Sequence, residues 1–156
     1  MSTELVRNAP VRAEYGMVLK ALKPVLHDLP AIIVVIDGRV GSGKTTLGRF
    51  LAWRFNITLI ETDLFMHRNK GKFTYRNDHV AEIIKERMAS DRPVLVEGVV
   101  ALRLLEDLCL THAFHVHLIC DESEGSSITE LEWNKYDAKY QPSAKADLSL
   151  CLPPLT

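Results

Sequence analysis

The feature that most constrains this chain is the stretch Ile32–Leu51, whose sequence is IIVVIDGRVGSGKTTLGRFL. Its first part, Ile32–Asp37, is a continuous apolar run, which is typical of a strand buried on both faces of a sheet. A glycine-rich turn follows, and then a helical pattern over Thr45–Phe55. A buried strand, a tight turn and a helix in this order predict a β-α-β unit, and with it a parallel sheet covered by helices.

The turn fits the pattern G-x-x-x-x-G-K-S/T between Gly38 and Thr45. Its backbone N–H groups are expected to surround a phosphate, and the positive N-terminal end of the following helix adds to the attraction. Lys44 would place a cation at the β- and γ-phosphates, and the Thr45 hydroxyl would complete a Mg²⁺ shell. A plain glycine-rich turn is the alternative. The predicted nucleotide-binding residues are Gly38, Arg39, Val40, Gly41, Ser42, Gly43, Lys44, Thr45 and Thr46.

The rest of the chain continues the alternation of strands and helices. Further strands are predicted at 57–60, 94–97, 113–120 and 146–152, and helices at 11–27, 78–89 and 101–108, with residues 122–136 helical in part. Pro24 is expected to bend the first of these helices or to end it early. We predict one α/β domain over 1–156, with an N-terminal helix at about 11–27 and a nucleotide-binding core at about 31–152. The architecture would be a three-layer α/β/α sandwich with a five-stranded parallel sheet, of P-loop NTPase type.

Two carboxylates are expected beside the phosphate loop, because ligands bind at the carboxyl ends of parallel strands. Asp63 follows the second strand and would accept a proton from an attacking hydroxyl or hold a metal-bound water. A capping role is the alternative for Asp63. Glu97 ends the third strand, where a buried, unpaired charge would be costly, so we predict that it faces Mg²⁺ and phosphate rather than a nearby arginine or lysine. The candidate metal ligands are Thr45, Asp63 and Glu97, and the candidate catalytic residues are Lys44, Asp63 and Glu97.

A polar, basic stretch, His67–His79, lies between the second strand and the next helix. In a phosphoryl-transfer enzyme an acceptor would dock here. Arg68 or Arg76 would contact an acceptor phosphate, and Tyr75 or Phe73 would pack on a ring or a sugar. The alternative is a solvated loop whose charges serve solubility.

Two histidines, His115 and His117, alternate along the fourth predicted strand, so their side chains point the same way. With His112 nearby they suggest a metal site, but two histidines without a third ligand at a defined spacing are more often core or surface residues. Asp37, directly before the phosphate loop, is a candidate to orient that loop.

Composition limits the class of protein and its partners. The 156 residues carry a formal net charge of -1, which gives no general attraction to nucleic acid or to an acidic membrane. The 3 cysteines form no C-x-x-C pair, which favours free thiols in a reducing compartment. The N-terminus shows no signal pattern, and no apolar run reaches about 20 residues. We expect a cytoplasmic protein with a small-molecule acceptor, with neither nucleic acid nor membrane as a partner, and with a candidate homodimer contact on the N-terminal helix.

Several segments together resemble the uridine kinase-like branch of the small P-loop kinases. They are VVIDGRVGSGKTTLGRFLA, ETDLF, DHVAEII, PVLVEGVVAL and YQPSAKADLSL, and they cover most of residues 32–151. The resemblance implies a five-stranded parallel sheet between helices. It also implies transfer of the γ-phosphoryl group of ATP, with Mg²⁺, to a hydroxyl of a nucleoside or a similar small metabolite. By position, the resemblance implies that Lys44 and Thr45 hold phosphate and metal, that Asp63 is the base, and that Asp78 and His79 bind the acceptor. Glu97 falls at the position of the family's third-strand carboxylate.

The chain departs from this family after the fourth strand. Family members carry an arginine-bearing lid there, whereas the segment DESEGSSITELEWNKYDAKY contains no arginine. Arg39, Arg103, Lys135 or Lys139 would have to supply the missing cation, because a lost arginine costs orders of magnitude in rate. The insert that enlarges the acceptor pocket is also short. The leading hypothesis is an ATP- and Mg²⁺-dependent phosphotransferase. The alternatives are a degenerate or regulatory nucleotide-binding protein without kinase activity, and an NTPase that couples hydrolysis to a partner.

Overall fold

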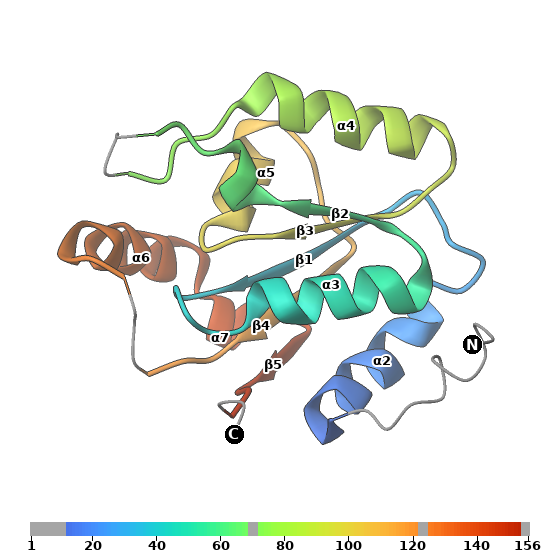
Figure 1. The fold of residues 1–156 in the computed structure, drawn as a ribbon, viewed down its shortest axis with the longest axis horizontal. Helices are drawn as coiled ribbons and strands as arrows, with labels where there is room; N and C mark the ends of the chain where they lie inside the picture. Colours follow the sequence, from blue (N-terminus) through green and yellow to red (C-terminus); the bar gives the residue numbers. More distant parts are fainter. Residues whose placement is uncertain (1–11, 69–71, 122–124, 154–156) are drawn as a thin grey trace.

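A computed structural model describes residues 12–68, 72–121 and 125–153. These residues form a five-stranded, all-parallel sheet with helices on both faces (Figure 1), which confirms the predicted three-layer architecture. The strands are β1 (Ile33–Gly38), β2 (Thr58–Glu61), β3 (Val94–Glu97), β4 (Phe114–Leu118) and β5 (Leu148–Leu150). The helices are α2 (Ala13–Val25), α3 (Lys44–Phe55), α4 (Asn77–Ala89), α5 (Ala101–Asp107), α6 (Ser127–Tyr140) and α7 (Pro142–Lys145), with a short 3-10 helix η1 (Thr62–Phe65).

The predicted strands and helices are present, with their ends shifted by a few residues. Helix α2 ends at Val25, one residue after Pro24, which agrees with the expected early end. The predicted start of this helix at Val11 lies outside the described residues. Helix α6 is longer than the partial helix that we expected, while η1 and α7 were not predicted, because elements of 4 residues are too short to show a periodic pattern.

The order of the strands places the phosphate loop at the centre of the molecule. The order is β2-β3-β1-β4-β5, so β1 lies between β3 and β4. The chain leaves β1 toward the face covered by α2 and α3, and it leaves β3 toward the face covered by α4, α5 and α6. Neighbouring strands that continue to opposite faces open a crevice at their carboxyl ends, where ligands bind in such folds.

Side chains along β1 alternate between the two layers of the core. Ile33 and Val35 pack with α4, α5 and α6, whereas Val34 and Ile36 pack with α2 and α3. Figure 1 shows these two groups of helices on opposite sides of the sheet. Asp37 continues the first series and contacts α6. The period of two therefore places a charged side chain in an otherwise apolar layer, beside the phosphate loop.

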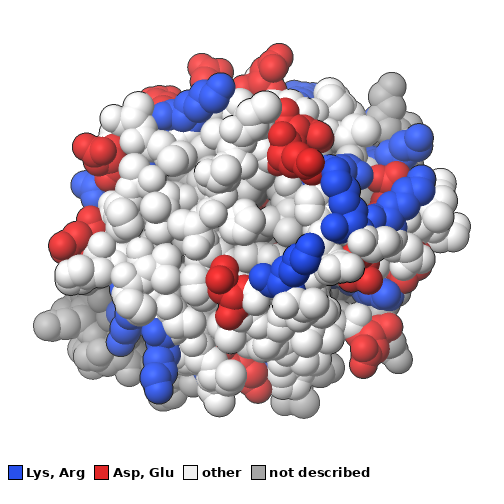
Figure 2. All heavy atoms as spheres, turned by 180° about the vertical axis from the view of Figure 1, so that it is seen from behind, with Lys and Arg blue, Asp and Glu red and all other residues white. Residues whose placement is uncertain are grey.

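The surface carries charges of both signs. Figure 2 shows the face opposite to that of Figure 1, where basic and acidic side chains are interspersed rather than gathered by sign. The exposed large apolar residues include Met17 on α2, Trp53 on α3, and Ile128 and Leu131 on α6. Among the described residues, no helix combines the length and the apolar character needed to cross a bilayer.

Candidate active site

The phosphate loop connects β1 to α3 and has a backbone that favours glycine. Gly41 and Gly43 adopt φ angles of 84° and 96°, in the left-handed region that other residues rarely enter. The backbone N–H of Ser42 bonds to the carbonyl of Arg39 at 3.1 Å, which closes a tight turn. Helix α3 then begins at Lys44, with Gly43 as its N-cap. The unpaired N–H groups of this helix start therefore open toward the crevice, as an anion site requires.

Lys44 is held inside the loop rather than extended into solvent. Its side chain is 7% exposed, and Nζ donates a hydrogen bond of 2.8 Å to the carbonyl oxygen of Arg39. Burial lowers the pKa of Lys44, while the carboxylates of Glu97, Asp63 and Asp37 act in the opposite direction. The ammonium group is thus held within the phosphate loop by the carbonyl oxygen of Arg39.

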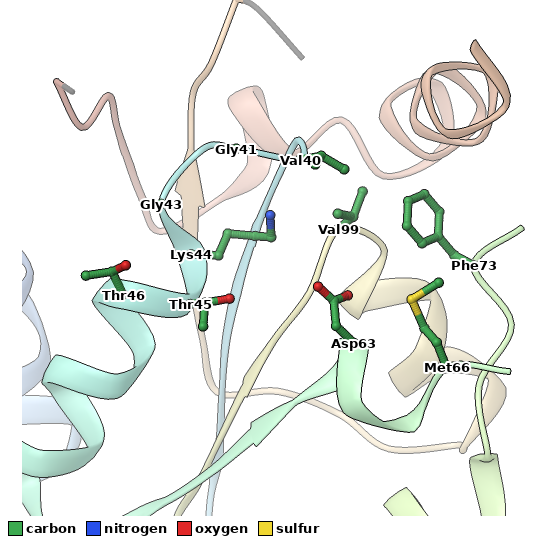
Figure 3. A pocket seen from close by; sticks show the side chains of 10 residues that line it. All are labelled: Val40, Gly41, Gly43, Lys44, Thr45, Thr46, Asp63, Met66, Phe73 and Val99. Atoms are coloured by element: carbon green, nitrogen blue, oxygen red, sulfur yellow. The ribbon is translucent and has the colours of Figure 1, made fainter. Parts of the chain in front are cut away.

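A cavity of about 360 Å³ opens in front of this loop. Figure 3 shows Lys44 and Thr45 on one side of the cavity, with the carboxylate of Asp63 turned toward them from the other side. Phe73 and Met66 form its apolar wall beyond Asp63. The remaining lining residues are Val40, Gly41, Gly43, Thr46 and Val99.

Asp63 lies within η1 and does not cap it, because the N-cap position belongs to Glu61. Its side chain is exposed to the cavity. The preceding residue, Thr62, is fully buried and packs against Gly98, where an added Cβ would lie 2.1 Å from Thr62 Oγ1. This close contact between η1 and the residue that follows β3 fixes the position of Asp63 relative to Glu97. The capping alternative for Asp63 therefore does not apply to this helix.

Glu97 is the buried carboxylate of the site. It is 1% exposed, and its Oε1 accepts a hydrogen bond of 3.0 Å from the Thr45 hydroxyl. Burial raises the pKa of Glu97, and the hydrogen bond from Thr45 and the charge of Lys44 offset only part of this effect. The direct partner of Glu97 is thus the hydroxyl predicted to bind Mg²⁺, and both oxygens are of the type that Mg²⁺ prefers.

The predicted acceptor residues lie on a stretch that folds back on itself. The backbone N–H of His67 bonds to the carbonyl of Thr74 at 2.9 Å, and Met66 and Tyr75 form an antiparallel bridge. Tyr75 and Phe73 are buried (9% and 5% exposed), and burial raises the pKa of Tyr75. A second cavity, of about 610 Å³, is lined by His67, Tyr75, Arg76, Asn77, Asp78 and His79.

Arg68 is exposed on the same stretch, directly before residues 69–71, which lie outside the described residues. The structure therefore brings Tyr75, Arg76, Asp78 and His79 to one cavity, with Arg68 nearby in the chain.

Both arginines that were expected to replace a lid arginine are bound by α6. Arg39 Nη1 donates to Glu130 Oε1 at 2.6 Å, and Arg103 Nη1 donates to Glu132 Oε2 at 2.9 Å. Arg103 also donates to the carbonyl of Phe73. In this conformation the guanidinium groups are thus held by carboxylates rather than presented to the cavity, which sequence reasoning did not anticipate.

Sequence reasoning also missed a buried cluster around Asp37. Oδ1 of Asp37 accepts hydrogen bonds from His115 Nε2 at 2.6 Å and from His117 Nδ1 at 2.9 Å, and Oδ2 accepts one from the Tyr136 hydroxyl at 2.6 Å. Burial alone would raise the pKa of Asp37, but these hydrogen bonds outweigh it and lower the pKa. The two histidines were expected in the core or on the surface, and they lie in the core. The adjacency of β1 and β4 is what joins them to Asp37.

Comparison with known protein sequences finds a relative over part of the chain. No family model matches the chain. Over 76 residues it is 38% identical to a shikimate kinase from Thermobifida fusca (strain YX), and the match covers 45% of this chain and 44% of that protein, which is less than half of its length.

Solved structures extend the comparison to most of the chain. A possible uridine kinase from Bacillus stearothermophilus superposes with a TM-score of 0.62 at 15% identity, covering 87% of this chain and 96% of that one. A gluconokinase from Sinorhizobium meliloti 1021 gives a TM-score of 0.49 at 19% identity, covering 81% and 86% of the two chains. The chain therefore has the α/β fold of the P-loop kinases of small molecules, and over part of its length it is similar to one of them in sequence.

Proposed function

We propose that this chain is an ATP- and Mg²⁺-dependent phosphotransferase that moves the γ-phosphoryl group to a hydroxyl of a small metabolite. The observation that carries the proposal is that Lys44, Thr45 and Asp63 line the same cavity. A carboxylate that faces the phosphate loop across a space of about 360 Å³ leaves room for an acceptor hydroxyl between base and phosphate. Positioning of this kind is the main task of a phosphoryl-transfer enzyme.

The residues of the loop would hold the nucleotide and its metal. The loop amides and the Lys44 ammonium group would bind the phosphates, and oxygens of Thr45, Asp63 and Glu97 would hold Mg²⁺, directly or through water. These donors fit the ion, because Mg²⁺ prefers oxygen ligands and because a cation beside the buried Glu97 carboxylate would compensate its charge. When bound, Mg²⁺ supplies positive charge to the β- and γ-phosphate oxygens.

Asp63 would act as the general base. A bond forms between the acceptor oxygen and the γ-phosphorus, the bond from the γ-phosphorus to the bridging oxygen breaks, and ADP leaves. The acceptor proton passes to the Asp63 carboxylate, whose exposure to the cavity lets it return the proton to water. Lys44 would stabilise the charge that develops on the transferred group.

The groups of the acceptor other than its reacting hydroxyl would bind at the second cavity, whose lining residues follow Asp63 in the chain. Arg76, Asp78 and His79 are exposed around it, and Arg68 lies close by in sequence. Arginines suit a phosphate or carboxylate group of the acceptor, and Asp78 suits its hydroxyls. Tyr75, which is largely buried, also lines this cavity. We therefore propose a polar acceptor that carries hydroxyls together with an anionic group.

The test is an ADP-release assay over nucleosides, sugars, hydroxy acids and their phosphates, combined with Asp63→Asn. The variant should still bind MgATP through the loop and Lys44, with affinity reduced only by the lost Asp63 contact to Mg²⁺, and it should lose acceptor-dependent ADP release. Asp91→Asn is the matched control, because Asp91 is exposed before β3, at the opposite end of the sheet, and its φ of 54° suits asparagine. Equal turnover by Asp63→Asn would remove Asp63 from the mechanism.

A second candidate function is nucleotide binding without transfer. The pairing of Arg39 and Arg103 with glutamates of α6 favours it, because neither guanidinium is presented to the phosphates in this conformation. The same assay separates the two functions. Saturable MgATP binding without ADP release for any acceptor would support the second and reject the first.

A further inference from the structure

A cluster of one aspartate and two histidines, residue types that can bind metal ions, lies next to the phosphate loop but does not line the cavity described above. Asp37 and His117 face each other across the β1–β4 pairing, and His115 lies one step back along the same side of β4. All three are buried, with exposures of 0% for Asp37 and 3% for each histidine, and α6 contacts Asp37 through Tyr136 and His117 through Trp133. The proposed phosphotransferase mechanism uses none of them.

The ligand atoms of these residues lie close together. Asp37 Oδ1 lies 2.6 Å from His115 Nε2 and 2.9 Å from His117 Nδ1, and all three atoms lie within 4.8 Å of one another. Ligands at the usual distance from Zn²⁺ in a tetrahedral site are about 3.3 Å apart. To admit an ion, the 2.6 Å and 2.9 Å separations would have to open by about 0.7 Å and 0.4 Å, and the two imidazole nitrogens, up to 4.8 Å apart, would have to approach each other.

Neighbouring residues fix the orientation of the ligands. The Tyr136 hydroxyl donates to the second oxygen of Asp37 at 2.6 Å and accepts from the backbone N–H of Leu102 at 3.2 Å. The ring of His117 stacks on Trp133, with an interplanar angle of 7° and centroids 6.0 Å apart. Outer contacts that hold a carboxylate and an imidazole in place are typical of protein metal sites.

We infer that Asp37, His115 and His117 form a binding site for a divalent transition-metal ion, with Zn²⁺ as its representative. Two imidazole nitrogens and one carboxylate oxygen suit Zn²⁺ and its neighbours, whereas Mg²⁺ and Ca²⁺ prefer oxygen alone. The dication would compensate the buried carboxylate. It would also tie β1 and β4 together beneath α6, the helix that holds the arginine of the phosphate loop. The inference stands independently of the proposed function.

The competing description is a metal-free hydrogen-bond network. In it, the two imidazoles and the Tyr136 hydroxyl hydrogen-bond directly to the Asp37 carboxylate, with no ion between them. The two descriptions differ in a measurable way, because only the first gives a saturable site for a metal ion.

The experiment is calorimetric titration of Zn²⁺ into the chelator-treated, untagged full chain with Mg²⁺ in excess, with Co²⁺ as a spectroscopic substitute. We expect one tightly bound ion per chain, a rise in melting temperature, and loss of the site in His117→Gln. Tyr136→Phe should weaken binding by about 10–100-fold, the usual effect of losing an outer contact. Circular dichroism will show whether His117→Gln folds. If it does not, the Zn²⁺ affinity of Tyr136→Phe and the effect of Zn²⁺ on the melting temperature of the wild type decide the question.

Two controls locate the site. His27→Gln removes another histidine beside a carboxylate, an exposed pair in which His27 lies 3.4 Å from Asp28, and it should bind Zn²⁺ as the wild type does. Glu97→Gln alters the proposed Mg²⁺ site and should also leave Zn²⁺ binding intact. The proposal is overturned by an absence of saturable Zn²⁺ binding, by wild-type binding in folded His117→Gln, or by loss of binding in either control.

Discussion

The Thr45 hydroxyl donates a hydrogen bond of 3.0 Å to Oε1 of Glu97, and this bond joins the first turn of α3 to the end of β3. The carboxylate is almost fully buried, and burial raises its pKa despite that hydrogen bond and the charge of Lys44. An ionised carboxylate in such a place lowers the stability of the fold. A glutamate beside Thr45, directly behind the lining of the cavity, is understandable if a bound cation compensates its charge.

Replacing Glu97 by glutamine should therefore stabilise the protein and weaken MgATP binding. A raised folded-state pKa means that the folded protein holds this proton more tightly than the unfolded chain does. The penalty for the ionised group is thus absent at acid pH and present above the folded-state pKa. We expect Glu97→Gln to increase the free energy of unfolding at neutral pH by about 0.5–2 kcal/mol, with little difference from wild type at acid pH.

Urea unfolding at the two pH values measures this effect. Glu82→Gln, at an exposed position of α4, is the control and should change neither stability nor nucleotide affinity. A less stable Glu97→Gln protein at neutral pH would show that the charged carboxylate is favourable in the fold.

Lys44→Met should remove most of the nucleotide affinity while preserving the fold. Methionine fills the space of the lysine stem but lacks the ammonium group, which lies within the phosphate loop at the carbonyl oxygen of Arg39. Hydrogen bonds to charged groups contribute about 1.5–3 kcal/mol, so we expect MgATP binding to weaken by roughly 10–150-fold. Calorimetry measures the affinity, and Lys20→Met on the exposed side of α2 is the control. Unchanged affinity would contradict the assignment of the loop as a phosphate site.

The contact between Arg39 and Glu130 should compete with nucleotide binding. Oε1 of Glu130 holds the guanidinium at 2.6 Å, while Oε2 is buried without a hydrogen-bond partner among the described residues. Glu130→Gln should release Arg39 toward the phosphates and tighten MgATP binding by up to about fivefold, since a partly exposed ion pair contributes at most about 1 kcal/mol. Glu132→Gln, which releases Arg103 instead, is the matched comparison. Weaker MgATP binding in Glu130→Gln would mean that Arg39 contributes to nucleotide binding in the position in which Glu130 holds it.

The strands and the phosphate loop were predictable because their signals are local. An apolar run, a glycine pattern and a helical period each lie within a few residues, and the carboxyl ends of parallel strands necessarily share one edge of the sheet. This is why Asp63 and Glu97 were expected near Lys44. The pairing of Arg39 with Glu130 was not predictable in this way, because it depends on where α6 settles on the sheet.

The Asp37 cluster shows the same limit. The shared direction of His115 and His117 follows from the period of a strand, but their contact with Asp37 requires β4 to lie beside β1 in a defined register. Tyr136 completes the cluster from a helix 99 positions away in the sequence. Long-range adjacency of this kind leaves no pattern in a single sequence.

Replacing Gly98 by alanine should destabilise the protein, because the space beside Gly98 is occupied by Thr62. An added Cβ would lie 2.1 Å from Thr62 Oγ1, 3.1 Å from its Cβ and 3.2 Å from its Cγ2, so rotation of the threonine side chain alone relieves only part of the clash. Overpacking of a buried contact costs about 1–3 kcal/mol, and we expect Gly98→Ala to lose that much stability. Displacement of Thr62 would also move the adjacent Asp63, so acceptor-dependent ADP release should fall more than MgATP affinity.

Gly16→Ala is the matched control, because Gly16 is an exposed position inside α2 with nothing within 4 Å of an added Cβ. This variant should gain about 0.5–1 kcal/mol from the better helix propensity of alanine. Opposite signs of the two stability changes in thermal or urea unfolding would support the close packing of η1 against the end of β3. A Gly98→Ala protein with wild-type stability and turnover would show that Thr62 moves aside without displacing Asp63, and that this contact does not hold the proposed base in place.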